Sequence, residues 1–414
     1  KTKELRWTPD VECDVRRMIR DYPIGNQHSL TDFVYRPETN VIGINLGTTN
    51  IICALHRAGD TKSEVLTFSD GKRIMPSVVE FDEIGNYKCC GSQAVENQKM
   101  NAGYVLYDAK MMIGQAYSNR LKLHDAYWPF EVKPNQDRRP VYVLSNIYGI
   151  LPERVSMELL RVIKKTAQQR LGSEEVRDCV ITVPAYFSME QKQATQEAAR
   201  DAGLNVLSLM TEPVAAACAY SFDHPQDNEF TLLVFNLEGG TFDVTIIKYE
   251  NGQFVTKCTD GDNNLGGRDF DNALFEYVKQ RIHTVSFEGP QSFKNRIKLM
   301  EKCEEIKADL NQYGKVIFKL KDFGNDSEIE ITQRIFREQT RGLMNSISYI
   351  CNRTDEDHQR PCSDIFPNQM QDEKGGASAD EAVAVGAAIR AAQLRDPKHK
   401  HVKNYIDALP IESE

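Results

Sequence analysis

The most constraining feature of this sequence is a strand–turn–strand pattern that occurs twice, about half the chain apart. An apolar run, a polar turn and a second apolar run occupy residues 41–55, and the same order returns at residues 232–247. Each copy has Asn-Leu at the end of its first run and Gly and Thr in its turn, so Asn45 and Asn236 lie 191 positions apart. Apolar runs around such a turn predict two paired strands. The repeat therefore predicts two lobes, each of which opens with a β-hairpin.

Helical and strand-like segments alternate over the rest of the chain. Apolar residues at helical spacing predict helices, and short apolar runs that end at a proline or glycine predict buried strands. We expect a strand over 178–183 and helices over 157–171, 188–202 with Ser188 as its N-cap, 293–310 and 379–394. Many small residues in the last helix favour close packing against a neighbour. This alternation indicates an α/β class.

Composition limits the partners and the compartment of the chain. Its 414 residues carry a net charge of −9, which makes it a poor candidate for binding nucleic acid or an anionic membrane. No stretch approaches the ~20 apolar residues of a membrane span. Ten cysteines without a C-x-x-C pair favour free thiols over disulfides or a zinc site. We expect a cytoplasmic protein, with a targeting segment removed before Lys1 as the alternative.

The two turns are candidate phosphate-binding loops. Gly and Thr offer backbone N–H groups and hydroxyls without a bulky Cβ, which suits phosphate oxygens. Two such loops that face each other across a cleft could hold the two ends of a triphosphate. A pair of ordinary hairpins without a ligand is the alternative that the spacing leaves open.

Six motifs resemble those of the heat-shock 70 kDa chaperone family, in the order in which that family has them. They are GINLGTT at 43–49, VPAYF at 183–187, TEPVAAA at 211–217, GGTFDV at 239–244, LGGRDFD at 265–271 and DEAVA at 380–384. The resemblance covers roughly residues 41–396. It implies an actin-like ATPase fold, with two duplicated lobes around a central nucleotide cleft. We expect an N-terminal extension over 1–40, lobe I over 41–225, lobe II over 226–396 and a flexible tail over 397–414.

The resemblance also implies a set of site residues. For catalysis these are Lys110, Glu212, Asp243 and Thr241, and Asp243 would also order water on a bound Mg²⁺. For ATP or ADP they are Asn45, Gly47, Thr48, Thr49, Asn236, Gly239, Gly240, Gly266, Gly267, Glu304, Lys307 and Asn311. J-domain co-chaperones and nucleotide-exchange factors are the implied partners. Unfolded clients are implied only if a peptide-binding domain exists elsewhere.

Several positions depart from the family pattern at the cleft. Asn45 and Asn236 replace aspartates that face the waters of Mg²⁺, and Glu238 replaces the first glycine of the second turn. Glu238 could obstruct phosphate, point to solvent, or replace a lost carboxylate, with Arg268 as its partner. On the adenosine side, Ala308 replaces an arginine that stacks on adenine. The family's glycine-rich adenine loop and the apolar strand before it have no counterpart, so we expect an incomplete second lobe with an exposed sheet edge.

Three functions follow from this pattern. The departures favour a pseudo-ATPase that binds nucleotide weakly and acts as a regulator or adaptor in protein folding. An active, ATP-hydrolysing chaperone domain is the alternative. Another actin-fold phosphotransferase, such as a sugar kinase, is disfavoured by the motifs.

Overall fold

A computed structural model describes residues 40–56, 62–124, 127–172, 176–223, 229–251, 253–288, 292–324, 326–353, 379–395 and 404–405. The expected extension lies outside these residues, except for residue 40. The expected tail, except for 404–405, also lies outside them. Residues 354–378 lie outside them too, and this is the part of the sequence where the pattern lacks the adenine loop. Within the described residues no disulfide joins any of the cysteines. None of the described helices is long and apolar enough to cross a membrane.

The first sheet contains the first predicted hairpin. Its strands run in the order β12-β11-β1-β2-β3, and β4 also pairs with β2. Their bounds are β1 Val41–Leu46, β2 Asn50–Leu55, β3 Glu64–Val65, β4 Met75–Pro76, β11 Asp178–Val183 and β12 Asn205–Thr211. β1 pairs antiparallel with β2 and parallel with β11, which confirms the hairpin and the buried strand. Every residue of β1 and β11 is buried, as expected of parallel strands with helices on both faces.

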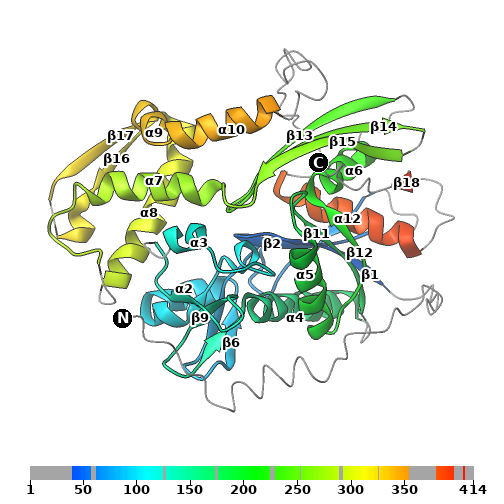
Figure 1. Cartoon of the computed structure of the whole chain (residues 1–414), viewed down its shortest axis with the longest axis horizontal. Coiled ribbons are helices and arrows are strands. Elements are labelled where there is room, and N and C mark those ends of the chain that lie inside the picture. Colours follow the sequence, from blue (N-terminus) through cyan, green and yellow to red (C-terminus); the bar gives the residue numbers. More distant parts are fainter. Residues whose placement is uncertain are drawn as a thin grey trace.

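Four helices cover this sheet. Their bounds are α4 Pro152–Leu171, α5 Met189–Asp201, α6 Glu212–Asp223 and α12 Ala379–Arg395. Apolar residues of α4 and α5 form one core with the sheet, and those of α6 and α12 form another. Ser188 caps α5 as predicted, because its side chain accepts a hydrogen bond from the Gln191 amide. Figure 1 shows α12 beside α6.

The last helix packs very closely, as its small residues predict. A Cβ added at Gly43 would collide with the backbone of α12, and one at Gly386 would collide with the Ala215 carbonyl of α6. Sequence order places α12 within the expected second lobe, but its contacts are with β1, β2 and β11 of the first sheet. The division of the chain into lobes at residue 225 stays a prediction.

The second sheet contains the second predicted hairpin. Its order is β13-β14-β15-β18, with bounds Phe230–Leu237, Phe242–Glu250, Gln253–Asp262 and Asn404–Tyr405. β13 and β14 pair antiparallel, so Asn236 lies opposite Asp243. Four helices follow: α7 Gly267–Lys279, α8 Phe293–Tyr313, α9 Gln333–Gln339 and α10 Arg341–Arg353. Between α8 and α9 the chain forms a hairpin of β16 Lys315–Lys319 and β17 Glu328–Thr332, with the 3₁₀ helix η4 Leu320–Phe323 between its strands. Its core lies between α7, α8 and this hairpin.

Two small sheets extend the first lobe. They comprise β5 Val79–Phe81, β6 Tyr87–Cys90 and β7 Val105–Leu106, and β8 Glu131–Pro134, β9 Pro140–Val143 and β10 Gly149–Ile150. The nearby helices are α2 Ser92–Asn101 and α3 Asn119–His124, with the 3₁₀ turns η1 Ala102–Tyr104 and η2 Ala109–Met111.

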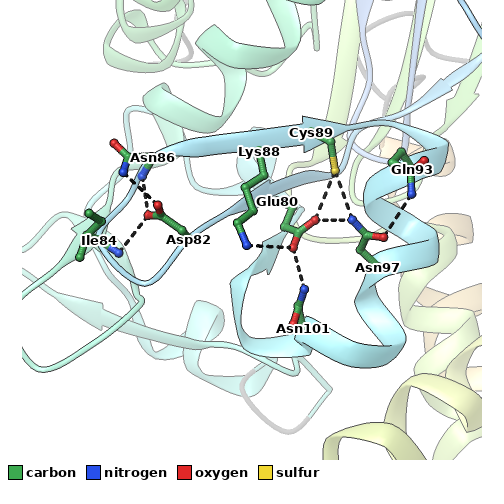
Figure 2. A network of polar contacts seen from close by, with 9 residues as sticks. All are labelled: Glu80, Asp82, Ile84, Asn86, Lys88, Cys89, Gln93, Asn97 and Asn101. Carbon is green, nitrogen blue, oxygen red and sulfur yellow. Dashed lines mark hydrogen bonds and ion pairs between the residues drawn. The ribbon is translucent and has the colours of Figure 1, made fainter.

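A buried carboxylate fastens α2 to the first of these small sheets (Figure 2). Glu80 on β5 accepts hydrogen bonds from Asn97 and Asn101 of α2, at 2.5 and 2.8 Å, and from the Cys89 thiol of β6. Burial alone would raise the pKa of Glu80, but these bonds lower it below its ordinary value. The carboxylate therefore holds three elements together in its charged form.

Candidate functional site

The two hairpin turns contact each other. A Cβ added at Gly239 would collide with the Thr49 hydroxyl, and one at Gly240 would lie 3.1 Å from the Thr48 methyl. A Cβ at Gly266 would likewise press on the backbone of Gly239 and Gly240. The structure thus brings the two predicted phosphate loops into contact, and glycine is what allows it.

Hydroxyl groups in these turns lie buried without a described partner. This is so for Thr48 and Thr241, each 1% exposed. The carbonyl of Gly47, by contrast, accepts a hydrogen bond of 2.7 Å from Ser77. Buried hydroxyls without partners are uncommon, because the lost hydration costs about 1–3 kcal/mol. Their chemistry suits an acceptor such as a phosphate oxygen.

Lys110 lies between two carboxylates beside the turns. Its ammonium, on η2, donates to Glu212 at 2.5 Å and to Glu238 at 3.0 Å. Lys110 and Glu212 are fully enclosed, and the Glu238 side chain is 14% exposed. Burial opposes the charge of Lys110, but the two carboxylates raise its pKa above the ordinary value. Glu238 therefore points inward to the predicted catalytic lysine and not to solvent.

The two asparagines that replace family aspartates are both engaged. Asn236 donates from Nδ2 to the other oxygen of Glu212, at 3.1 Å. Asn45 accepts a hydrogen bond of 3.2 Å from the Thr182 hydroxyl on β11. Asn236 therefore joins the hydrogen-bond network around Lys110 through Glu212, whereas Asn45 is held by β11. Neither contact leaves a carboxylate where the family pattern places one.

Asp243 is the buried carboxylate without a strong partner. Its side chain is wholly enclosed and lies near the Ala185 and Tyr186 amides, but neither oxygen makes a described hydrogen bond of good geometry. Burial and the Glu238 charge raise its pKa to about 7, against the opposing effects of Lys110 and of these amides. Burial, with the Glu238 charge, also raises the pKa of Glu212. Two of the predicted catalytic carboxyls therefore favour a proton more than ordinary carboxyls do.

This raised pKa predicts a stability that increases as the pH falls. An unfolded Asp243 is ionised above its ordinary pKa of 3.8, whereas the folded residue takes up a proton below about 7. The folded state then binds more protons, so between pH 7 and pH 5.5 this one group adds about 1.6 kcal/mol. Urea unfolding at several pH values should show the rise in the natural chain. The rise in stability should be smaller in Asp243→Asn. In the control Asp309→Asn, on the exposed side of α8, it should be as large as in the natural chain. Equal curves for all three proteins would contradict this prediction.

Arg268 does not pair with Glu238, which corrects the expectation from sequence. Its Nε lies 2.6 Å from Oδ1 of Asp108, and its guanidinium lies over the Tyr107 ring at 4.9 Å. Asp108 is fully buried and also accepts a 2.8 Å hydrogen bond from the Trp128 indole. The sequence reasoning missed this carboxylate. Its place two residues before Lys110 was the signal that could have found it.

The residues predicted for adenosine lie on α8 and at the start of α7. Lys307 donates to Asp271 at 2.7 Å and to the Gly267 carbonyl at 3.1 Å. The Gly267 amide in turn donates to the Glu238 carbonyl at 2.7 Å, which links this end to the second turn. Glu304 is half exposed, and its carboxylate lies 3.8 Å from Arg268.

A cavity of about 680 Å³ opens beside Lys307 and Asn311, one turn apart on α8. Its other walls come from α9 and α10, and the lining residues include Leu310, Phe336 and Met344. The two predicted residues therefore face an open pocket. Glu304 is not among the lining residues.

The donors present fit a phosphate better than a metal ion. The turns provide glycines and two buried hydroxyls without partners. No group of three or more His, Cys, Asp or Glu side chains that could hold a metal occurs in the described part of the chain. Of the carboxylates here, Glu212 and Glu238 are bound to Lys110, and Asp243, which has no described cation within ion-pair distance, has a raised pKa. The residues therefore fit Mg²⁺ poorly, since it is held by charged carboxylates together with waters and phosphates.

Comparison with known proteins decides the family. The family model of the Hsp70 protein matches residues 41–366, most of the chain.

The chain belongs to the Hsp70 family.

Its Hsp70 relatives include bacterial chaperones. The chaperone protein DnaK of Anaplasma marginale is 35% identical over 356 residues, which are 84% of this chain and 52% of the relative. DnaK of Deinococcus deserti is 33% identical, over 84% of this chain and 59% of the relative. DnaK of Deinococcus radiodurans is also 33% identical, over 89% of this chain and 62% of the relative. The chain thus spans about half to three-fifths of the length of these relatives. Its Hsp70 membership and its mixed α/β sheets confirm the expected actin-like ATPase fold.

Proposed function

We propose that this chain is an Hsp70-type nucleotide-binding domain in which ATP binding is weakened and ATP hydrolysis is weak or lost. It acts as a regulator or adaptor in protein folding, in the cytoplasm, with J-domain proteins and nucleotide-exchange factors as the partners that its family implies. The observation that carries the proposal is the ion pair between Glu238 and Lys110, 3.0 Å long. The lysine that would steady the charge of a transferred phosphoryl group already holds a carboxylate.

Electrostatics supports a weakened affinity for nucleotide. A carboxylate and a phosphate charge about 5 Å apart repel by about 3 kcal/mol at an effective dielectric constant of ~20. Glu238 lies in the turn that would cradle phosphate, directly before Gly239, which faces Thr49. A nucleotide would therefore have to displace Glu238 from Lys110 or accept this repulsion.

The metal side supports the same proposal. ATP and ADP bind to Hsp70 proteins together with Mg²⁺, which shields the phosphates and neutralises charge. Asn45 and Asn236 offer no negative charge, and both amides have partners within the protein. Asp243 is the remaining candidate for ordering metal-bound water, and its raised pKa weakens it in that role.

An active ATPase is the second candidate, and one observation favours it. The Thr48 and Thr241 hydroxyls are buried without described partners, as expected of groups kept for a ligand. In that case Thr48, Thr49 and Thr241 would hold phosphate oxygens, and Lys110 would have to exchange Glu238 for phosphate. A sugar-kinase function gains no support from an Hsp70 chain.

Calorimetric titration with Mg²⁺-ATP and Mg²⁺-ADP, followed by single-turnover hydrolysis, tests the proposal. The nucleotide-binding domain of Deinococcus radiodurans DnaK is the positive control. We expect binding at least about one hundredfold weaker than in the control, from the repulsion of about 3 kcal/mol. Affinity and turnover equal to those of the control would refute the pseudo-ATPase.

A further inference from the structure

The outer edge of β13 has no described neighbour. β13 ends the second sheet, and its pairing from Phe230 to Leu237 is with β14 alone among the described strands. None of its eight residues is buried, whereas the first six of β14 all are. A row of backbone N–H and C=O groups on this edge is therefore available for pairing.

The duplicated first lobe indicates what such an edge would accept. There β1 has its hairpin partner β2 on one side and the parallel strand β11 on the other. β13 and β14 repeat β1 and β2, but the position that corresponds to β11 is open in the described part of the second sheet. By this internal comparison the matching neighbour of β13 is a parallel strand.

Helices cover much of the second sheet on both faces, but they leave part of β13 open. On one face, Ile347 and Ile350 of α10 form a core with apolar residues of β14, against which Leu233 of β13 is partly buried. On the other face, α6 and α12 form a core with β14, against which alternate residues of β13 from 230 to 234 are partly buried (Figure 1). Phe235 and Leu237 stay exposed. A strand added to the edge would find apolar side chains on both faces of β13, which favours an apolar run over one that alternates with charged residues.

β13 also lacks the features that usually protect a sheet edge. Residues 231–237 contain no charge, proline or glycine, and the pairing with β14 runs without a bulge. Phe235 and Leu237 are 43% and 38% exposed. The β16 edge is different, because Lys315 and Lys319 flank its exposed Ile317. Charged residues of this kind block edge-to-edge pairing, and β13 has none.

We propose that β13 is a docking edge for a strand from another polypeptide. The partner is an extended, uncharged segment rich in β-branched and other apolar residues, which pairs in parallel with β13 as β11 pairs with β1. Backbone hydrogen bonds supply the affinity, and packing on Phe235 and Leu237 supplies the specificity. A second copy of β13 is a poorer partner, because antiparallel self-pairing that sets Phe230 against Leu237 also sets Glu229 against Glu238. The proposal is independent of nucleotide binding.

Hydrogen exchange of the full chain tests the open edge first. We expect faster exchange in β13 than in β1, which is paired on both sides. Equal protection of the two strands in a monomer would overturn the proposal, because another segment of the same chain would then cover the edge. Protection that grows with protein concentration, together with a dimer in light scattering, would overturn it in favour of a second copy.

Binding of a defined peptide tests the partner chemistry. The probe is a fluorescein-labelled peptide with the uncharged β11 residues 179–183, CVITV, between polar flanks; the control peptide has proline in place of the isoleucine. We expect the probe, and not the control, to bind and to protect β13 from exchange. Phe235→Lys with Leu237→Lys should weaken binding at least about tenfold. Leu237→Lys alone should act in the same direction, and it is included because Phe235 also packs on the Phe242 ring.

Ile317→Lys is the matched control, because Ile317 is 45% exposed on a different sheet edge. It should leave peptide binding unchanged, and melting temperatures should show that all variants are folded. The proposal fails if the Lys variants bind as tightly as the natural chain, or if Ile317→Lys weakens binding as much as they do. It also fails if neither peptide protects β13.

Discussion

Replacing Glu238 by glycine is expected to tighten ADP binding about one hundredfold. The variant removes the carboxylate from Lys110 and from the turn beside Gly239, so it removes a repulsion of about 3 kcal/mol against a phosphate charge. Lys110 then keeps Glu212 and gains room for an anion. Isothermal titration of the natural chain and Glu238→Gly with ADP, with and without Mg²⁺, measures the change.

Glu238→Gln separates charge from size. If charge is the obstacle, the glutamine variant should recover most of the affinity; if the side chain itself fills the space, only glycine should do so. Adding Asn45→Asp and Asn236→Asp to Glu238→Gly should strengthen the dependence on Mg²⁺. It should still give only partial recovery, because the sequence pattern lacks the adenine loop. An unchanged affinity in Glu238→Gly would show that Glu238 does not limit nucleotide binding.

Replacing Lys110 by methionine is expected to destabilise the fold by about 3–5 kcal/mol. Lys110 is the cation that both Glu212 and Glu238 contact, and Glu212 is completely buried. Removing it leaves two carboxylates and the nearby Asp243 without their compensating charge. Urea denaturation at pH 7 of the natural chain and Lys110→Met measures the loss.

Two variants control for this effect. Lys302→Met removes a lysine that pairs with Glu305 near the surface of α8, and such pairs contribute at most about 1 kcal/mol. Lys110→Met combined with Glu212→Gln and Glu238→Gln removes the stranded charges and should regain part of the stability. A loss below about 1 kcal/mol in Lys110→Met alone would show that the cluster relaxes or takes up water without its lysine.

Local patterns in the sequence predicted the two hairpins, one buried strand and four of the helices. β11 has the predicted bounds, and α5 begins after Ser188 as its capping pattern indicates. These features depend on residues a few positions apart, so the sequence contains the whole cause. The position of α12 was harder to predict. Its small residues indicate close packing, but sequence order alone does not name the sheet on which it packs.

The sequence predicts which residues form the candidate site, but not which of them pair with one another. The motifs place Lys110, Glu212 and Asp243, and the structure brings the first two together. Glu238 meets Lys110 across 128 positions, and Arg268 meets Asp108 across 160. Such partners are set by how the two lobes face each other, and no local spacing encodes that. Arg268 was therefore assigned the wrong carboxylate.

The close packing of α12 on β1 and α6 also affects how the chain folds during its synthesis. Residues 379–395 complete the core that Val41, Ile52 and Val180 begin, so the first sheet lacks one of its covering helices until residue 395 has left the ribosome. Pairing across so many residues slows folding, and apolar surface stays exposed in the meantime. During its own synthesis this Hsp70 chain presents the kind of surface on which chaperones act.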